Sequence, residues 1–186
     1  MTDVQTSADG RIVDAALTLI AERGLGGVTM TEIAARAGVA RQTLYNHYPD
    51  VDSIVVAVLD RHAADSLARV TALIGTADSA DAKLELLVRH TVAAAAHGHP
   101  AADFQAGLSP PARATIEEHG EAARGLIASI LEEGVAGGTF LDTVDPNAYA
   151  YLVQATLLGG VDLAVASGDQ AEAAALTTEM ILRSLR

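Results

Sequence analysis

The chain of 186 residues contains no cysteine, and its aromatic content is only 3%. Without thiols it can form neither a disulfide scaffold nor a thiolate metal site. No stretch approaches the roughly 18 uninterrupted apolar residues of a membrane helix. The segment MTDVQTSADG is acidic and lacks the basic and then apolar order of a secretion signal. We therefore expect a soluble, cytoplasmic protein with no membrane partner.

Positive charge is also scarce. Twelve Lys and Arg residues face 24 Asp and Glu residues, which gives a formal net charge of −12. Because nucleic acids and anionic lipids attract cationic surfaces, this balance argues against diffuse affinity for either. A local basic patch can still override the total.

Helix-forming sequence is abundant. Half of the residues are apolar, alanine is frequent, and β-branched residues rarely alternate with polar ones, so helix propensity dominates. A chain of this length can bury a real core. We predict an all-α fold, in which glycines and prolines separate helices over residues 9–23, 29–38, 41–48, 52–74, 80–97, 101–105, 110–135, 146–167 and 170–185.

Several of these helix ends carry capping signals. Thr29, followed three residues later by Glu32, has the form of a capping box. Ser109 and Asp145 each precede a proline and are predicted N-caps. Gly24 is expected to close the first helix in a left-handed cap.

Residues 28–48, VTMTEIAARAGVARQTLYNHY, form the most informative segment. Its apolar residues are spaced to bury one face of each of two short helices against the first helix, across a tight turn at Gly38 and Val39. The outward residues of the second short helix are of the kinds that read base edges and phosphates in a major groove. They are Arg41, Gln42, Thr43, Tyr45 and His47. By spacing alone, a helical hairpin inside a larger bundle explains the segment equally well.

The stretch TEIAARAGVARQTLYNHY, with the preceding helix and its glycine-rich loop, resembles the tetracycline-repressor (TetR) family of bacterial transcription regulators over roughly residues 9–55. The resemblance implies a helix-turn-helix DNA-binding domain over residues 1–50 and a helical ligand-binding and dimerisation domain over residues 51–186. It also implies a homodimer on palindromic operator DNA. The DNA-contacting residues that it implies are Thr29, Thr31, Arg41, Gln42, Thr43, Tyr45 and His47, although Thr29 is as well explained as a helix cap.

One position departs from the family pattern. Family members commonly have a lysine at the start of the fourth helix, where its charge and the helix dipole meet a phosphate. This chain has Val51 there, between Asp50 and Asp52, and residues 1–52 carry four Arg, no Lys and seven acids. We expect operator affinity to be modest or strongly salt-dependent, or the phosphate contact to have moved to Arg11 or Arg36.

For the regulatory domain, the resemblance implies that a small molecule changes the separation of the two recognition helices by shifting a conformational equilibrium. Few bulky residues and many alanines favour an apolar or amphipathic effector, and we predict a repressor that the effector releases, with no cofactor. The candidate effector-binding residues are His62, His90, Phe104, His119, Tyr151 and Gln154, with Asp103, Phe140 and Tyr149 as further polar or aromatic groups.

The last two helices have apolar stripes suited to a four-helix dimer bundle. The predicted interface comprises Tyr149, Val153, Thr156, Gly160, Ala174, Thr178, Ile181 and Leu185. Glycines within a helix cost about 1 kcal/mol each relative to alanine. A close approach across the twofold axis offsets this at Gly159 and Gly160; the alternative is a local kink.

Other functions account for parts of the sequence. Histidines at 62, 90, 97, 99 and 119 raise the possibility of a metal sensor, but two of them fall in a predicted loop, and we predict no metal. A helical adaptor that does not bind DNA would follow if the acidic first domain abolished operator affinity. No nucleophile with a neighbouring base is recognisable by motif, so we predict that the protein is not an enzyme.

Overall fold

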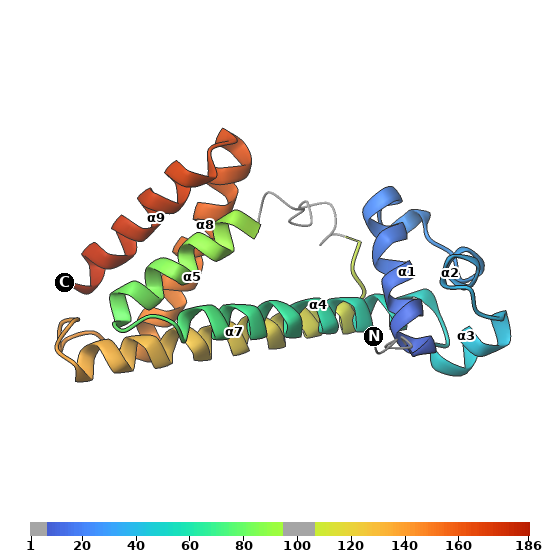
Figure 1. The fold of residues 1–186 in the computed structure, drawn as a ribbon, viewed down its shortest axis with the longest axis horizontal. Helices are drawn as coiled ribbons and strands as arrows, with labels where there is room; N and C mark the ends of the chain where they lie inside the picture. Colours follow the sequence, from blue (N-terminus) through green and yellow to red (C-terminus); the bar gives the residue numbers. More distant parts are fainter. Residues whose placement is uncertain (1–6, 95–106) are drawn as a thin grey trace, which may run out of the picture. The chain divides into compact units, whose positions relative to one another are not determined.

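The computed structural model describes residues 7–94 and 107–186, which contain helices and no strand, and the all-α prediction is confirmed (Figure 1). The helices are α1 (Ala8–Arg23), the short 3-10 helix η1 (Leu25–Gly27), α2 (Met30–Ala37), α3 (Arg41–His47), α4 (Val51–Ile74), α5 (Ala80–Ala94), α7 (Pro110–Ala136), α8 (Pro146–Ser167) and α9 (Gln170–Leu185). The helix predicted over residues 101–105 lies outside the described residues.

The chain divides into two compact units. Of the described residues, the first unit contains 7–64 and 107–118, and the second contains 65–94 and 119–186. Both α4 and α7 therefore contribute residues to each unit. These compact units do not coincide with the DNA-binding and regulatory domains that the resemblance implies, whose boundary lies between residues 50 and 51. That boundary stays a prediction.

The core of the first unit forms where α1 packs on α2 and α2 packs on α3. Its largest fully buried side chains come from each of these helices and from α4: Ile12, Leu19, Ile33, Leu44 and Ile54. The inward face predicted for the two short helices is confirmed, because Ile33, Ala34, Ala37 and Leu44 are buried and Val39 packs against them half-buried.

The predicted caps form, with one difference. The hydroxyl of Thr29 accepts from the Glu32 N–H at 3.3 Å, while the Glu32 carboxylate accepts from the Thr29 N–H at 3.1 Å. Asp145 caps α8, and Ser109 accepts from the Ala112 N–H. Gly24 has a positive φ of 72° but an extended ψ of 172°, so the predicted left-handed helical cap is not formed there.

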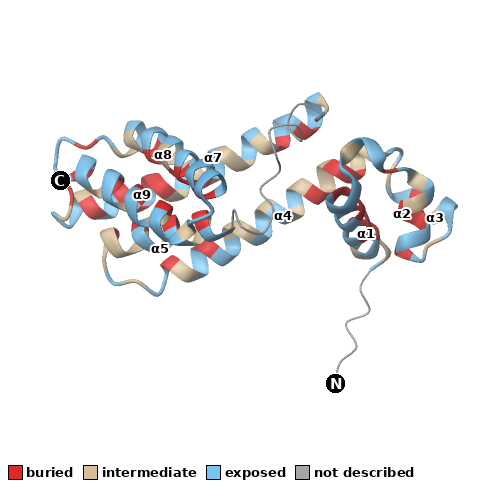
Figure 2. Cartoon of the chain, turned by 90° about the horizontal axis from the view of Figure 1, so that it is seen from above, coloured by how far each residue is buried: buried red, intermediate tan, exposed pale blue. Residues whose placement is uncertain are grey.

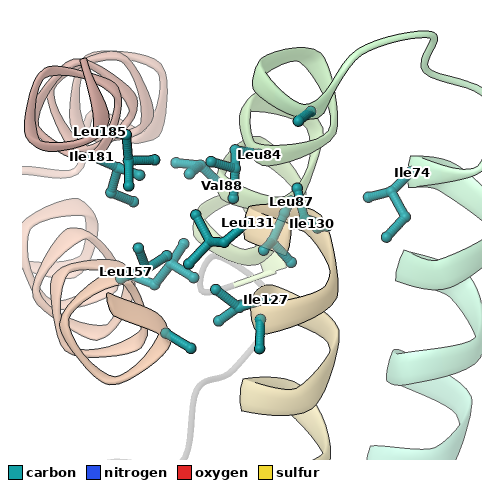
Figure 3. Packing of buried hydrophobic residues seen from close by; sticks show 14 of the residues in the cluster. Ile74, Leu84, Leu87, Val88, Ile127, Ile130, Leu131, Leu157, Ile181 and Leu185 are labelled. Atoms are coloured by element: carbon teal, nitrogen blue, oxygen red, sulfur yellow. The ribbon is translucent and has the colours of Figure 1, made fainter. Parts of the chain in front are cut away.

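The second unit packs α5, α8 and α9 around a cluster that also includes residues of α7 (Figure 3). Leu84, Leu131 and Leu185 are fully buried in it. Gly134 of α7 allows the Phe140 ring to approach, because a Cβ at this position would lie 2.1 Å from a ring carbon. Phe140 is therefore a core residue, 4% exposed in the subunit.

Helix α8 is apolar on nearly all sides. By length and composition it is the one described helix that could cross a membrane, with a mean hydropathy of 1.4 over its most apolar window, and one third of that window is buried in the subunit. The core helix of a soluble protein passes the same test. Figure 2 shows buried and exposed residues alternating around α8 and α9.

Candidate nucleic-acid interface

The turn between α2 and α3 is set by Gly38. Its φ of 64° and ψ of 37° are left-handed helical values, which glycine adopts without steric cost. The Val39 N–H donates to the Ala34 carbonyl at 3.1 Å and the Gly38 N–H to the Ala35 carbonyl at 3.3 Å. This is a Schellman motif, which satisfies the last carbonyls of α2 and stops the helix. Helix α3 begins three residues after Gly38 and is anchored by the buried Leu44.

Outside that anchor, α3 presents polar side chains to solvent. Arg41, Gln42, Tyr45 and His47 are exposed and Thr43 is half-buried, so these residues lie on the outward side, where the spacing predicts them. The contacts of these residues with DNA stay predictions.

Two hydrogen bonds connect residues of this outward surface. The Arg41 guanidinium donates from Nη2 to the Thr31 hydroxyl of α2 at 2.6 Å. Gln42 donates from Nε2 to Oδ1 of Asn46 at 3.0 Å. Asn46 is exposed but is not among the DNA-contacting residues predicted from the sequence. Its position four residues after Gln42 places it on the same helix face, which is a signal that could have identified it.

The C-terminal end of α3 is tied to the N-terminal end of α1. The Tyr48 hydroxyl donates to Asp9 at 2.6 Å, and His47 Nδ1 lies 3.9 Å from the same carboxylate oxygen. Burial of the Tyr48 hydroxyl, together with the hydrogen bond to Asp9, raises the pKa of Tyr48 to about 12. This contact fixes where α3 ends relative to α1.

Carboxylates occupy most of the arginines around this surface. Arg23 pairs with Glu32 at 2.6 Å, and Arg61 pairs with Asp14. Arg36 pairs with Glu22 through two hydrogen bonds of 3.2 and 2.9 Å, and the bond from Arg36 lowers the pKa of the Glu22 carboxyl. Because this carboxylate already occupies Arg36, a phosphate contact moved to that residue would have to displace Glu22.

The start of α4 does not favour a phosphate. Asp50 accepts hydrogen bonds from the Ser53 N–H at 2.8 Å and from the Ser53 hydroxyl, and these bonds lower its pKa. An ionised carboxylate therefore already occupies the helix terminus that would attract an anion. Val51, the first residue of α4, is half-buried and supplies no charge.

Of the predicted effector-binding residues, Tyr151 and Gln154 of α8 are brought together by Arg124 of α7. Arg124 donates to Gln154 Oε1 at 2.9 Å, and its guanidinium carbon lies 4.7 Å from the centre of the Tyr151 ring. Gln154 in turn donates to the Gly120 carbonyl at 3.0 Å. Arg124 is not among the effector-binding residues predicted from the sequence, because no sequence pattern distinguishes it from other arginines on helix surfaces.

The other described candidates for effector binding differ in their exposure. His62 is exposed in the first unit, and His90 and His119 are half-buried in the second. Phe104 and Asp103 lie outside the described residues. An open groove of about 550 Å³ runs between α5 and α9. Its lining consists of four alanines, Gln170, Thr178 and the charged residues Glu85, Arg89 and Glu179, and it includes none of the six predicted effector-binding residues.

In the described ranges, no three His, Cys, Asp or Glu side chains lie close enough together to hold a metal ion. His97 and His99, which entered the metal-sensor alternative, lie outside these ranges.

The predicted dimer interface needs correction. Val153, Ile181 and Leu185 are at most 2% exposed and belong to the core of their own subunit. Gly160 is buried as well, because a Cβ there would lie 2.2 Å from the Thr177 hydroxyl of α9. These four residues have no surface left for a partner, and their prediction is wrong. Tyr149, Thr156, Ala174 and Thr178 are half-buried.

Other apolar side chains of α8 and α9 point outward. Leu152, Val165 and Met180 are 62, 63 and 65% exposed. We call the set formed by these three residues with Tyr151, Leu158, Leu163 and Leu176 the outer α8–α9 face. Large apolar side chains that a subunit leaves exposed on two packed helices are typical of an interaction surface.

A helix-turn-helix with a polar outer face, followed by a separate helical unit, defines a transcription regulator of the helix-turn-helix class. The chain belongs to the TetR family: the profile of the bacterial regulatory proteins of the tetR family matches residues 12–58, and that of the tetracyclin repressor-like C-terminal domain matches residues 98–180. The resemblance seen in the sequence is confirmed.

Individual relatives agree with this assignment. The chain is 31% identical to the HTH-type transcriptional repressor KstR2 of Rhodococcus jostii, over 72% of this chain and 68% of the relative. It is 41% identical to an HTH-type transcriptional regulator of Mycobacterium tuberculosis, but this match covers only 38% of this chain and 37% of that regulator. Both relatives are named as transcription regulators.

Solved structures share the fold. The transcriptional regulator FadR from Bacillus subtilis, in complex with stearoyl-CoA, superposes with a TM-score of 0.74 at 23% identity, covering 93% of this chain and 95% of that one. A similarity of this kind supports the fold.

Proposed function

We propose that this TetR-family regulator is a repressor that binds a palindromic operator as a homodimer and is released by an apolar or amphipathic small molecule. The observation that carries the proposal is the outer face of α3, where Arg41, Gln42, Tyr45 and His47 are exposed around the buried anchor Leu44. Such side chains bind base edges and phosphates when a helix lies in the major groove. Thr43 and Thr29 complete the proposed contacts with DNA, and Thr31 belongs to the same proposed DNA-binding surface.

The outer α8–α9 face supports the homodimer. Its members are 42 to 65% exposed in the single subunit, and pairing two copies across a twofold axis would remove this apolar area from water. A dimer held in this way presents two copies of α3 at a fixed separation, which a palindromic operator requires.

The effector class is supported by the composition of the second unit and by a structural neighbour. Alanines line the groove between α5 and α9, and the FadR structure contains stearoyl-CoA, which joins an acyl chain to a charged group. An effector that binds better to the state in which the two α3 helices no longer match the operator would shift the population away from DNA.

Selection of bound duplexes from a random pool tests the DNA-binding part. We expect enrichment of one palindromic sequence, and Arg41→Ala should weaken binding to it by about 5- to 150-fold, the range for one bidentate base contact. Arg69→Ala, at an exposed arginine of α4 in the second unit, is the matched control and should bind as the wild type does. If the wild type enriches no sequence, the adaptor alternative replaces the repressor.

Titration of the protein–operator complex with stearoyl-CoA tests the effector part. Release of DNA at micromolar acyl-CoA, with no release by coenzyme A alone, supports an effector with an apolar chain. Equal release by both compounds would show that the chain is not recognised.

A further inference from the structure

The hydrogen bond between Arg41 and Thr31 joins two residues of the candidate interface to each other. Thr31 lies in the first turn of α2 and Arg41 is the first residue of α3; both are exposed, and the donor and acceptor atoms are 2.6 Å apart. An exposed arginine samples many rotamers. When DNA binding fixes one of them, the side chain loses conformational entropy, and this loss weakens binding. The hydrogen bond to Thr31 restricts Arg41 before DNA binds, so less entropy is lost on binding.

The chemistry of the acceptor distinguishes Arg41 from its neighbours. Arg23, Arg36 and Arg61 of the same unit are held by carboxylates, which cancel their charge. Arg41 is held by a neutral hydroxyl, and within the described parts of the chain it has no ion pair. The hydroxyl of Thr31 therefore orients the guanidinium while leaving its positive charge available.

The hydrogen bond to Thr31 also leaves two adjacent N–H donors of Arg41 free for a bidentate contact with a base. A guanidinium has five N–H donors, and Thr31 uses one of the two on Nη2. If it uses the one nearer Nε, the pair formed by Nη1 and Nη2 stays free; otherwise the pair formed by Nε and Nη2 stays free. Either pair matches the O6 and N7 acceptors of guanine.

We propose that Thr31 is a positioning residue that holds Arg41 in the orientation for reading one guanine per half-site, and that Thr31 acts through Arg41 and not by contacting DNA itself. This inference rests on the proposed function, since it assigns a division of labour within the same DNA-binding surface.

The test uses the full-length protein and the duplex obtained by selection. The guanine that Arg41 reads is identified as the position at which Arg41→Ala loses its base preference. Replacing that guanine by 7-deazaguanine removes the N7 acceptor. We expect the replacement to weaken binding of the wild type and of Thr31→Ser, and to leave Arg41→Ala unchanged.

Thr31→Val keeps the shape of the side chain and removes the acceptor. It should bind the selected duplex about 2- to 10-fold more weakly, the range for ordering one flexible side chain on binding, and should lose part of the discrimination against 7-deazaguanine. Thr31→Ser, which keeps the hydroxyl, should restore both. Equal thermal unfolding midpoints for the three proteins establish that the fold is unchanged.

The double variant Thr31→Val/Arg41→Ala separates positioning from direct contact. If Thr31 acts through Arg41, the double variant binds no more weakly than Arg41→Ala alone. The proposal is overturned if Thr31→Val weakens binding equally in both backgrounds, which is the result for a phosphate contact of its own, or if it has no effect in either. It is also overturned if Arg41→Ala relaxes no guanine position. In these cases a selected duplex still supports the repressor, whereas failure to select any duplex removes both proposals.

Discussion

The two exposed surfaces of this protein have opposite chemistry. The outer face of α3 is polar and carries hydrogen-bond donors around a single buried leucine, whereas the outer α8–α9 face is apolar and its leucines, valine and methionine are open to solvent. A polar helix face suits base edges and phosphates, and an apolar one suits another protein surface. The two units therefore present surfaces of different chemistry, one polar and one apolar.

The largest effect, on dimerisation, is expected from placing charged side chains on the outer α8–α9 face. Leu152→Asp with Met180→Asp places two carboxylates on the outer α8–α9 face, and twofold symmetry repeats each change in the partner. We expect dimerisation to weaken by at least about 3 kcal/mol, because these apolar side chains would no longer leave water. Sedimentation of the variant should show monomers.

Leu141→Asp is the matched control, since Leu141 is 48% exposed in the loop before α8. It should sediment as the wild type does. A dimer that survives the double change would place the interface elsewhere.

The next effect compares two adjacent glycines of α8, of which Gly159 is exposed and Gly160 is buried. Gly160→Ala brings a Cβ to 2.2 Å from the Thr177 hydroxyl, so we expect thermal stability to fall by about 1 to 3 kcal/mol through overpacking. Gly159→Ala meets no atom within 4 Å and should stabilise the isolated subunit by up to about 1 kcal/mol through helix propensity. Equal unfolding midpoints for the two variants would contradict the close packing of α8 on α9.

A smaller effect is expected at the polar surface. Val51→Lys adds a cation at the start of α4 and should strengthen binding to all duplexes by several-fold at low salt. The slope of log affinity against log salt should steepen by about 0.9 if the lysine neutralises one phosphate. Ala68→Lys adds the same charge to an exposed position of α4 in the second unit. Identical behaviour of the two variants would mean that the start of α4 does not face DNA.

The smallest effect concerns Tyr48. Its pKa is raised to about 12 in the fold from an ordinary value of 10.0, so the neutral hydroxyl is favoured by folding. The stabilisation is complete below pH 10 and is lost as the pH rises through about 12. Tyr48→Phe should lower stability by about 1 kcal/mol at neutral pH, the usual contribution of one hydrogen bond, and should abolish this alkaline dependence in chemical unfolding. Tyr45→Phe, at an exposed tyrosine of α3, should leave the dependence unchanged.

The two surfaces also differ in how far the sequence predicts them. The capping box at Thr29, the turn at Gly38 and the inward side of α2 and α3 depend on residues close together in the chain, and their patterns predict them correctly. Helix α3 has a single buried residue, Leu44, so its outward side is unambiguous.

The face of α8 is a harder problem, because the helix is apolar almost all the way round and several stripes have helical spacing. Which stripe is buried is decided by contacts distant in sequence, such as that of Gly160 with Thr177, and half of the residues predicted for the dimer interface belong to the core of the subunit. The ion pairs that occupy Arg36 and Arg23 likewise join separate helices, and sequence spacing gives no signal for them.

The most direct test of the account changes the spacing between the two half-sites of the selected operator. If the outer α8–α9 face holds two copies of α3 at a fixed separation, inserting about five base pairs turns one half-site to the opposite side of the duplex. Affinity should then fall at least about 10-fold, to that of a single half-site. Unchanged affinity would contradict the account, because it would show that the two helices do not read the operator as one rigid pair.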